Sequence, residues 1–203
     1  MAQRAIAHEP GVRTSTGLSN AKLAVWTFLA SECLLFGALI STFLLYKDRT
    51  LPGTPTPRTA YDIPYTSVSS FVLLMSSLTM VLALAAIQRG DHEKLRTWLM
   101  ATALLGMTFI GGQVYEFTRF VQEGLTLKTN LFGTSFFVLT GFHGAHVTGG
   151  ILMLLSLYGM SVQGHLPTER AETVELVGLY WHFVDVVWIV IFTVVYLIPT
   201  GGK

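Results

Sequence analysis

The sequence predicts an all-α integral membrane bundle of five transmembrane helices, on three observations. First, the 203 residues are 51% hydrophobic and only 12% charged, with a mean hydropathy of +0.55, whereas soluble domains carry about 25% charged residues. Second, five apolar segments each reach roughly the 20 residues that cross a ~30 Å hydrocarbon core. Third, none of them alternates with the period of two expected of a β-barrel strand, so helices are the spanning elements.

The first two predicted helices flank one long polar segment. Residues 23–46 read LAVWTFLASECLLFGALISTFLLY and residues 68–87 read VSSFVLLMSSLTMVLALAAI, so both are apolar over a full membrane crossing. The stretch between them, RTLPGTPTPRTAYDIP at residues 49–64, is rich in proline, glycine and threonine, which is typical of an irregular loop. Residues 1–22 contain no apolar run of the signal-peptide kind, and they predict a polar N-terminal tail.

The other three predicted helices complete a transmembrane domain of residues 23–198 and are joined by short polar loops. They cover residues 98–117 (WLMATALLGMTFIGGQVYEF), 131–162 (LFGTSFFVLTGFHGAHVTGGILMLLSLYGMSV) and 176–198 (LVGLYWHFVDVVWIVIFTVVYLI). The segment at residues 131–162 is long enough to tilt or kink in the bilayer. Residues 199–203 form a short C-terminal tail.

Charge, cysteine content and missing motifs exclude several classes of function. The formal net charge is only +1, which does not suit a nucleic-acid-binding domain. Cys33 is the single cysteine, so the chain forms neither an intrachain disulfide nor a cysteine-based zinc or iron–sulfur site. The sequence has no P-loop, no G-x-G-x-x-G before a helix, no G-x-S-x-G and no H-E-x-x-H. An isolated catalyst is therefore hard to derive from this chain.

The positions of lysine and arginine give a small preference for one orientation. By our count about seven lie on the side of the N-terminus and about six on the opposite side. Because positive residues are in excess on the inner side of a membrane, this difference favours an N-terminus inside and a C-terminus outside.

Six ionisable residues lie inside the predicted spans. A charge at the bilayer centre costs about 2.5–3.5 kcal/mol on insertion scales, so such residues mark functional or structural sites. They are Glu32 in the first helix, Glu116 in the third, His143 and His146 in the fourth, and His182 and Asp185 in the fifth.

Glu32 lies near the middle of the first predicted helix. It is about nine residues, or roughly 14 Å, from the start of that segment, and the residues one turn away are leucine and phenylalanine. Burial among apolar side chains disfavours the ionised carboxylate, so we expect a neutral carboxyl. Two interpretations stay open: an acid that handles protons or contacts lipid, and a protonated carboxyl that hydrogen-bonds a neighbouring helix.

The polar residues of the last two helices form two pairs, and each pair shares a helix face because its members are three residues apart. One arrangement would bring His143, His146, His182 and Asp185 together with Glu116 in an interior polar cluster. Di-iron bundles use Glu-x-x-His pairs, which no helix here contains. A haem would need facing histidines on two helices, such as His143 or His146 against His182. A hydrogen-bonded cluster without metal is the commoner outcome in a polar membrane core.

The fourth predicted helix also carries a stripe of small residues. Gly141, Ala145 and Gly149 are spaced four apart, a pattern that lets another helix approach closely. At 100° per residue, His143 lies roughly 200° around the helix from Gly141. The helix is therefore predicted to have one close-packing face and one polar face.

Four stretches of the sequence together resemble subunit III of the haem–copper terminal oxidases. They are WTFLASECLLFGALISTFLLY, GQVYEF, GTSFFVLTGFHGAHVTGG and YWHFVDVVWIVIFTVVYL. The resemblance covers nearly all of residues 23–198 in the family's order. The chain is similar to the five-helix bacterial form, which lacks the first two helices of the seven-helix form.

The resemblance implies an accessory subunit of a proton-pumping respiratory oxidase in the bacterial inner, or plasma, membrane. Its haems and copper would belong to partner subunits, and this chain would hold no cofactor apart from bound phospholipid. The implied partners are subunit I in direct contact, subunit II, small subunits, membrane phospholipids and a respiratory supercomplex. The subunit would support the stability of subunit I and proton uptake.

The resemblance assigns no catalytic, cofactor-binding or metal-binding residue. It implies that Glu32 falls at the family's buried carboxyl and Glu116 at the acid of its YE motif. The four polar residues of the last two helices fall at the family's motif positions there, and the implied topology has the N-terminus inside and the C-terminus outside.

Alternatives stay open at this stage. The GTSFFVLTGFHGAHVTGG and GQVYEF stretches look more like the cytochrome c oxidase branch than like quinol oxidases. A freestanding membrane haem or metal protein that uses the histidines is a second reading. A transporter with an acidic relay through Glu32 and Asp185 is a third, although no internal repeat is evident.

Overall fold

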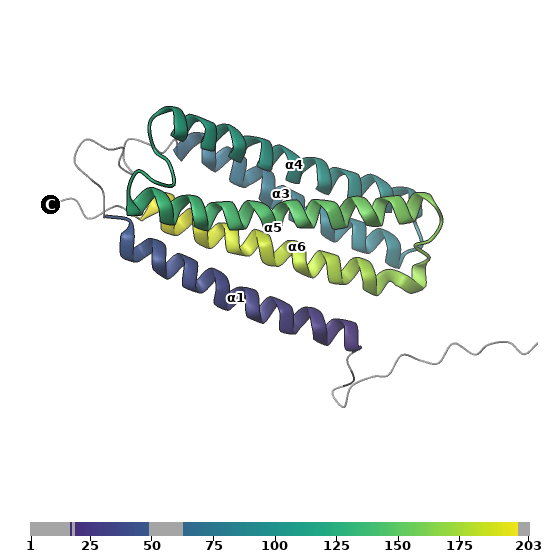
Figure 1. The fold of residues 1–203 in the computed structure, drawn as a ribbon. Helices are drawn as coiled ribbons and strands as arrows, with labels where there is room; N and C mark the ends of the chain where they lie inside the picture. Colours follow the sequence, from purple (N-terminus) through teal and green to yellow (C-terminus); the bar gives the residue numbers. More distant parts are fainter. Residues whose placement is uncertain (1–16, 18, 49–62, 199–203) are drawn as a thin grey trace, which may run out of the picture.

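A computed structural model describes residues 17, 19–48 and 63–198, and it contains five long helices and no strand within these residues (Figure 1). Each of the five is long and apolar enough to cross a membrane. The predicted all-α membrane bundle is thereby confirmed. Both predicted tails, apart from the start of the first helix, and most of the predicted loop at residues 49–64 lie outside the described residues.

The first three of the five described helices are longer than the hydrophobic runs that predicted them, and the last begins earlier than its run. The bounds of the five are α1 Asn20–Tyr46, α3 Ile63–Gln88, α4 His92–Gln122, α5 Leu131–Val162 and α6 Ala171–Phe192. A 3₁₀ turn, Thr168–Arg170, precedes α6, and a π-helical turn, Thr193–Leu197, extends it. The range predicted for α5 is the observed one. The others extend into polar flanks because a helix continues past the hydrocarbon core for as long as its ends are capped.

Capping residues explain where the two longest helices begin. At the start of α4 the Asp91 carboxylate accepts a hydrogen bond from the Lys94 backbone N–H at 3.0 Å. At the start of α5 the Asn130 side-chain oxygen accepts from the Gly133 N–H at 2.6 Å. Asp and Asn are preferred at this position because they satisfy backbone donors that have no partner inside the helix. Gly90 precedes Asp91 with a φ of +73°, which glycine adopts without strain.

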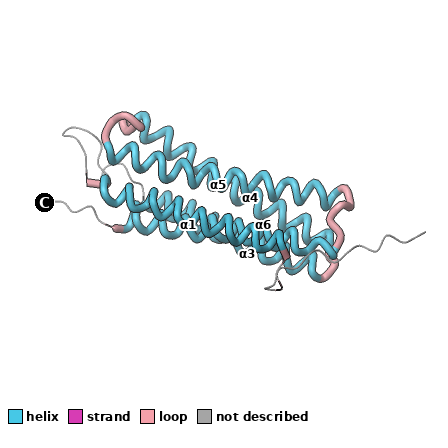
Figure 2. The backbone as a smooth tube through the Cα atoms, turned by 60° about the horizontal axis from the view of Figure 1, so that its bottom comes forward, coloured by secondary structure: helices cyan, strands magenta, loops and turns pink. Residues whose placement is uncertain are grey.

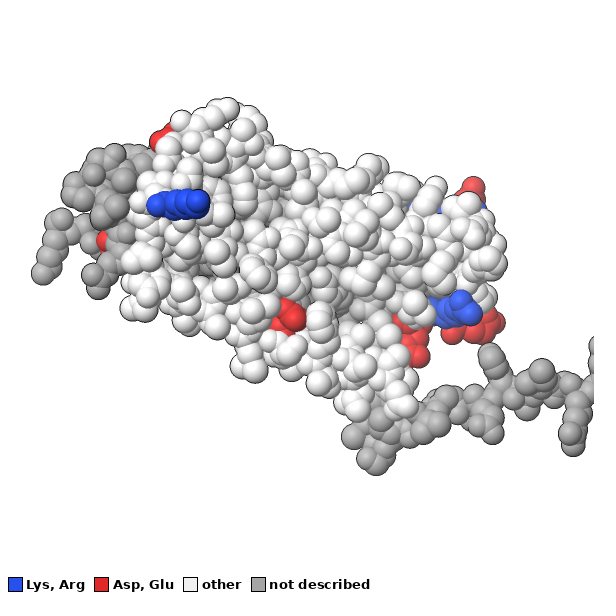
Figure 3. All heavy atoms as spheres, viewed as in Figure 1, with Lys and Arg blue, Asp and Glu red and all other residues white. Residues whose placement is uncertain are grey.

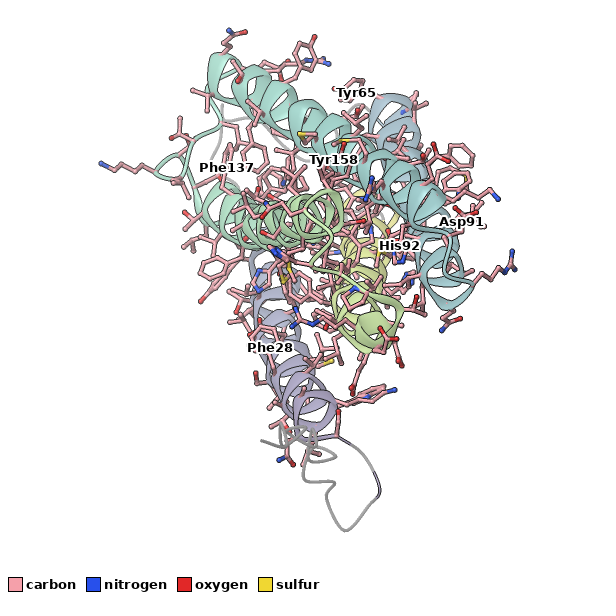
Figure 4. The ribbon with its side chains drawn as sticks, turned by 90° about the vertical axis from the view of Figure 1, so that its right-hand side faces the viewer. Phe28, Tyr65, Asp91, His92, Phe137 and Tyr158 are labelled. Atoms are coloured by element: carbon pink, nitrogen blue, oxygen red, sulfur yellow. The ribbon has the colours of Figure 1, made fainter. Side chains whose placement is uncertain are left out.

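Helices α3, α4, α5 and α6 form a closed four-helix ring, in which each contacts two neighbours, and α1 packs outside it against α5 and α6. The helices run alongside one another and the loops lie at the two ends (Figure 2). A view from the end of the bundle shows α1, which carries Phe28, apart from the other four (Figure 4). Only 17% of the apolar window of α1 is buried, against 33–44% in the other helices. The ring is therefore the core, and α1 is peripheral.

Trp181 of α6 occupies the centre of the ring. A Cβ atom added at Gly106 of α4 or at Gly150 of α5 would come within 2.6 or 2.7 Å of its indole ring. Only glycine leaves enough room at these two positions. The indole N–H donates to the Ser76 hydroxyl of α3 at 2.9 Å, so all four helices of the ring meet at this side chain.

The distribution of charge on the surface matches a membrane protein. On the face shown in Figure 3, lysine, arginine, aspartate and glutamate lie mostly toward the two ends, and the middle is almost free of them apart from one small acidic spot. An apolar band flanked by charged ends is what a bilayer requires, because lipid tails cannot solvate charges.

Candidate functional site

The six ionisable residues predicted inside the membrane do not gather into one cluster. The structure divides them among four separate environments: a Glu32–His146 pair, a chain from His182 through Ser77 to Asp185, an isolated His143, and Glu116 at one end of the bundle. The proposed meeting of the two i, i+3 pairs with Glu116 is therefore not the observed arrangement. Glu116 is separated from the others along the bundle, and the remaining groups face different neighbours around their helices. The sequence spacing within a helix does not fix which neighbour each face meets.

Glu32 and His146 join α1 to α5 through a hydrogen bond. His146 Nε2 lies 3.0 Å from Glu32 Oε2, and the two side chains are 17% and 13% exposed. Phe36 packs one turn along α1, with its ring centroid 5.0 Å from that of His146. The Tyr180 hydroxyl of α6 donates to the His146 carbonyl at 2.9 Å. This pair therefore sits where α1, α5 and α6 meet.

Hydrogen-bond geometry limits the protonation states of the pair. His146 Nδ1 lies 2.8 Å from the Phe142 carbonyl oxygen, and since a carbonyl only accepts, Nδ1 must carry a proton. Nε2 then either accepts from a protonated Glu32 or, as Nε2–H, donates to the Glu32 carboxylate. In both states one proton lies between the two groups. The pair can pass between a neutral form and an ion pair by moving that proton a short distance.

A second chain of polar groups links α6 to α3. The Ser77 hydroxyl donates to Asp185 Oδ2 at 2.5 Å, and His182 Nδ1 lies 3.1 Å from the same hydroxyl oxygen. Because the hydroxyl hydrogen is used toward Asp185, the hydroxyl oxygen accepts from His182 Nδ1–H. Asp185 is 4% exposed, and its other oxygen, Oδ1, has no hydrogen-bond partner among the described residues.

His143 is fully buried between aromatic rings. Its imidazole stacks on Trp188 with centroids 4.9 Å apart, and Phe109 meets its edge at 5.9 Å. Neither ring nitrogen has a hydrogen-bond partner in the part of the chain that the structure describes. An unpaired charge would be costly there, so the site favours the neutral imidazole.

Glu116 belongs to the end of the bundle where α3 begins and α6 finishes. It is 6% exposed and accepts a hydrogen bond from the Thr66 hydroxyl at 2.9 Å and from the Tyr196 hydroxyl at 3.2 Å. These bonds connect α4 to α3 and to the turn after α6. Its contacts are those of a structural joint between helices.

Two apolar grooves flank α1. The first, which we call the Cys33 groove, lies between α1 and α6 and has a volume of about 400 Å³. Its lining residues are Trp26, Leu29, Ala30, Cys33, Leu179, His182, Phe183 and Val186. The second, the Met153 groove, has a volume of about 420 Å³ and is lined by residues of α1, α5 and α6. It is lined by Val25, Phe28, Gly149, Met153, Thr173, Leu176, Val177 and Tyr180.

The predicted small-residue stripe is not a contact face within this chain. A Cβ atom at Gly141 would meet nothing within 4 Å, and one at Gly149 would meet only the Tyr180 hydroxyl at 3.7 Å. Ala145 between them is exposed. The close contacts of α5 use other glycines: Gly144 lies against Gln113 of α4, and Gly150 against Trp181. Use of the stripe by a helix of another subunit stays a prediction.

The sequence did not lead us to the serine and threonine hydroxyls that hydrogen-bond to the predicted residues. Ser77 and Thr66 of α3 bind Asp185 and Glu116. Ser76 and Ser70 of the same helix accept from the indoles of Trp181 and Trp188. A signal was present, since the two tryptophans are seven residues apart and the two serines six apart, which is about two helical turns in each case. Buried indole N–H groups in lipid need such acceptors.

The described residues contain no group of three or more His, Cys, Asp or Glu side chains placed to hold a metal ion. What the arrangement offers chemically is hydrogen bonding between helices and two places, the Glu32–His146 pair and the His182–Ser77–Asp185 chain, where a proton can change position.

Comparisons with known proteins point to one family. A family model described as cytochrome c oxidase subunit III matches residues 3–200. Cytochrome c oxidase subunit 3 of Bacillus sp. (strain PS3) is 40% identical over 90% of this chain and 88% of its own length. Quinol oxidase subunit 3 of Bacillus subtilis (strain 168) is 38% identical over 94% of this chain and 92% of its own length. A cytochrome c oxidase subunit 3 from Synechocystis is 43% identical over 84% of this chain and 72% of its own length.

Proposed function

The chain belongs to the cytochrome c oxidase subunit III family, and from that membership we propose that it is a non-catalytic subunit of its oxidase. Membership makes it part of a multi-subunit terminal oxidase in a membrane, and the five apolar spans agree with that place. The observation that carries the non-catalytic role is how the intramembrane polar groups are used. Glu32, Glu116 and Asp185 each bind a side chain of another helix, as groups that hold a bundle together do.

We propose that haems and copper lie in partner subunits and that this chain packs directly on subunit I, with subunit II, small subunits and a respiratory supercomplex as further partners. The open positions Gly141 and Ala145 of the stripe support a close contact with a helix outside this chain, since small residues let helix backbones approach. Gly149 lines the Met153 groove instead. In this role the subunit supports the stability of subunit I and its proton uptake. Bound phospholipid is the only ligand that the proposal gives to this chain, and the apolar Met153 groove can hold its acyl tails.

We propose the bacterial inner membrane as the location, with the N-terminus in the cytoplasm and the C-terminus outside. The excess of lysine and arginine on the N-terminal side supports this orientation. For the electron donor, relatives at 40% and 38% identity carry the names of both a cytochrome c oxidase and a quinol oxidase. Our proposal of cytochrome c rests on the GTSFFVLTGFHGAHVTGG and GQVYEF motifs.

Purification through a tag on this chain in a mild detergent tests the proposal. We expect co-purification of two larger subunits that contain haem and copper, together with cytochrome c oxidase activity. The separated chain should show no Soret band and no stoichiometric iron or copper. A haem spectrum of the separated chain would contradict the non-catalytic role, and oxidation of quinol instead of cytochrome c by the complex would reassign the donor.

A further inference from the structure

A notch between α4 and α5 opens to the outside of the bundle. It has a volume of about 180 Å³ and is lined by Gly141, Gly144 and Thr148 from α5 and by Gln113, Val114 and two further apolar side chains from α4. Val114 at its edge is 60% exposed. Small-molecule pockets typically hold ~300–1,000 Å³, so this notch has room for a single side chain rather than for a cofactor.

The carboxamide of Gln113 is held in one orientation beside this notch. Gln113 is 8% exposed, and its Nε2 donates to the Thr140 carbonyl oxygen of α5 at 2.8 Å. Because a carbonyl only accepts, the atom that faces it must be the nitrogen, and the other end of the amide is the oxygen Oε1. Oε1 lies over Gly144, where an added Cβ atom would be 2.8 Å from it. The glycine therefore leaves free the place that the amide oxygen occupies.

Gln113 Oε1 is an acceptor that lacks a strong donor. No hydrogen bond to it occurs among the described residues, and the Gly144 hydrogen that stands where a Cβ would be gives at most a weak C–H···O contact. Unlike the ring nitrogens of His143, which are enclosed without a partner, Oε1 is reachable through the notch that Gln113 lines. Gly144 lies about 13 residues, or roughly 20 Å, from the nearer end of α5. At that depth lipid tails offer no donor.

The surroundings of Oε1 determine which donor fits. None of the residues that line the notch is ionisable, so a lysine or arginine would be buried there without a counter-ion, which lipid disfavours. The Thr148 hydroxyl donates to the Gly144 carbonyl at 2.8 Å and so also presents only an acceptor. A neutral side chain with a hydrogen to donate suits this site, and serine, threonine, asparagine and glutamine provide one.

The α5 side of the notch is shaped for a helix. Gly141, Gly144, Ala145 and Thr148 recur at i, i+3, i+4 and i+7 and therefore share one face. An added Cβ at Gly141 would meet nothing within 4 Å, and Ala145 and Thr148 are exposed. Small residues on one face let a second helix backbone approach closely, which brings a side chain of that helix within reach of the notch.

We propose that the notch receives a serine, threonine, asparagine or glutamine side chain from a transmembrane helix of another subunit of the oxidase, and that this side chain donates to Gln113 Oε1. The inference rests on the proposed function in taking its partner from the oxidase. It adds the face of α5 that is used, the level in the membrane and the chemistry of the contact.

A photo-crosslink from Val114 identifies the partner. p-Benzoylphenylalanine replaces Val114 in the tagged chain, the complex is irradiated in its native membrane, and mass spectrometry of the digested product locates the linked residue. We expect one transmembrane helix of another subunit, with a serine, threonine, asparagine or glutamine within one turn of the link. The same replacement at Val186 of α6, a valine that is 57% exposed on a different helix, is the matched control and should not link to that helix.

Variants test the hydrogen bond itself. Gln113→Leu removes the acceptor but also the bond to Thr140, so it is combined with alanine at the linked donor. The rate at which this subunit leaves the complex after dilution into detergent should show a coupling of about threefold between the two changes, the average for side-chain hydrogen bonds between membrane helices. Gln113→Glu keeps an acceptor oxygen and should retain most of the coupling. Thr148→Val keeps the shape of the notch and is the control, with no coupling to the donor.

Links from Val114 to lipid alone, to a second copy of this chain or to a helix without such a donor would overturn the proposal, and so would independent effects of the two changes. If Gln113→Leu does not assemble, Gly144→Ala, whose Cβ displaces Oε1, replaces it. The link from Val114 leaves Gln113 unaltered and decides the partner in either case. The subunit composition and haem spectrum of the unirradiated complex show whether the chain is part of an oxidase, so failure of the proposed function is seen separately.

Discussion

At the scale of single residues, the Glu32–His146 pair has the clearest chemical constraint. The Phe142 carbonyl fixes the proton on His146 Nδ1, so a single proton is shared between Nε2 and Glu32 Oε2 across 3.0 Å. The sequence predicted a neutral carboxyl with a partner on another helix or a role in proton handling. That partner is His146 of α5. A proton shared between the two side chains is compatible both with a structural hydrogen bond and with proton handling.

We expect Glu32→Ala to leave the initial rate of oxygen reduction nearly unchanged while shortening the time for which the complex sustains turnover. The substitution leaves His146 Nε2 without a partner in a mostly buried contact, which costs about 1–3 kcal/mol and loosens α1. Oxygen-electrode traces over repeated turnovers, with bound phospholipid measured by mass spectrometry, check both effects. Glu123→Gln, a partly exposed carboxyl paired with Arg119, is the control and should resemble the unmodified complex. Immediate loss of haem reduction in an assembled Glu32→Ala complex would contradict this prediction.

The sequence was sufficient to find the ionisable residues of the candidate site, but it did not reveal which side chains hydrogen-bond to them. Charges and histidines stand out in an apolar run because their cost in lipid is high, so all six were identified from the sequence. Serine and threonine cost little and bond to their own helix, as Ser70 also does toward the Thr66 carbonyl. The matched spacing of Ser70 and Ser76 with the two tryptophans was a signal for the indole acceptors, but no spacing marked Ser77, whose partners Asp185 and His182 lie on another helix.

At the scale of one helix, α5 distinguishes two kinds of glycine. We expect Gly150→Ala to destabilise the subunit by about 1–3 kcal/mol, because the added methyl overpacks a filled core. Its Cβ would lie 2.7 Å from the Trp181 ring. Gly141→Ala, whose Cβ would meet nothing within 4 Å, is the matched control and should change stability by less than about 0.5 kcal/mol. Thermal unfolding of this subunit within the complex measures both, and equal effects would contradict the observed helix contacts.

The outward stripe of α5 calls for a bulkier change. Gly141→Leu should leave the fold of this chain intact, because the position is open, but should reduce incorporation of the subunit into the oxidase if a helix of another subunit packs there. The ratio of this subunit to haem in the purified complex gives the result. Normal incorporation would remove the stripe from the proposed contact with subunit I.

The start of α4 offers a prediction that depends on pH. Asp91 lies between two spans, and its bonds from Lys94 hold the pKa of the carboxyl below its ordinary value. The cap and its ion pair to Lys94, at 2.8 Å, therefore stabilise the first turn at pH values above about 3.9, the pKa of the carboxyl in the unfolded chain. This stabilisation is lost as the pH falls through the lower pKa of the folded state. Asn caps a helix as well as Asp does and does not titrate.

Amide hydrogen exchange in the first turn of α4 measures this effect. The ratio of exchange rates between the unmodified chain and Asp91→Asn should be constant near neutral pH and should rise below about pH 4. Taking a ratio removes the intrinsic pH dependence of exchange. Asp91→Ala should exchange faster at every pH, because it removes the side-chain cap altogether. A ratio that does not change with pH would mean that the Asp91 charge contributes nothing to the cap.

At the scale of the whole molecule, the number, type and approximate place of the helices followed from the sequence, and their arrangement did not. Hydrophobic runs of membrane length locate spans reliably because lipid excludes polar backbone. The same lipid makes each helix apolar on all sides, so hydrophobic periodicity does not mark the inner face as it does in soluble bundles. Because α5 has no marked inner face, the spacing of small residues was used to predict its packing face as Gly141, Ala145 and Gly149. Within this chain the close contacts with neighbouring helices are made by Gly144 and Gly150.

The peripheral position of α1 leads to a prediction about how it is held. Its first turns are tied to α6 by the Lys22–Glu175 ion pair at 2.5 Å and by a hydrogen bond from the Ser19 hydroxyl to Glu172. Both lie near the end of the bundle, where water solvates the charges and an exposed pair contributes only a small stabilisation. Farther along its length, α1 is held against α5 and α6 by apolar contacts and by the Glu32–His146 hydrogen bond.

Replacing Glu172 and Glu175 together by Gln should therefore raise amide exchange in the first turns of α1 by up to about fivefold, the modest effect expected of exposed pairs. Exchange at the level of Glu32 should change much less, because the His146 bond persists there. Glu93→Gln, an exposed acid at the start of α4, is the control. About 0.5 M salt should reproduce the effect in the unmodified complex, since screening weakens surface pairs. If the double variant exchanges at the original rate at low salt, apolar contacts alone hold this end of α1, and the ion pair has no mechanical role.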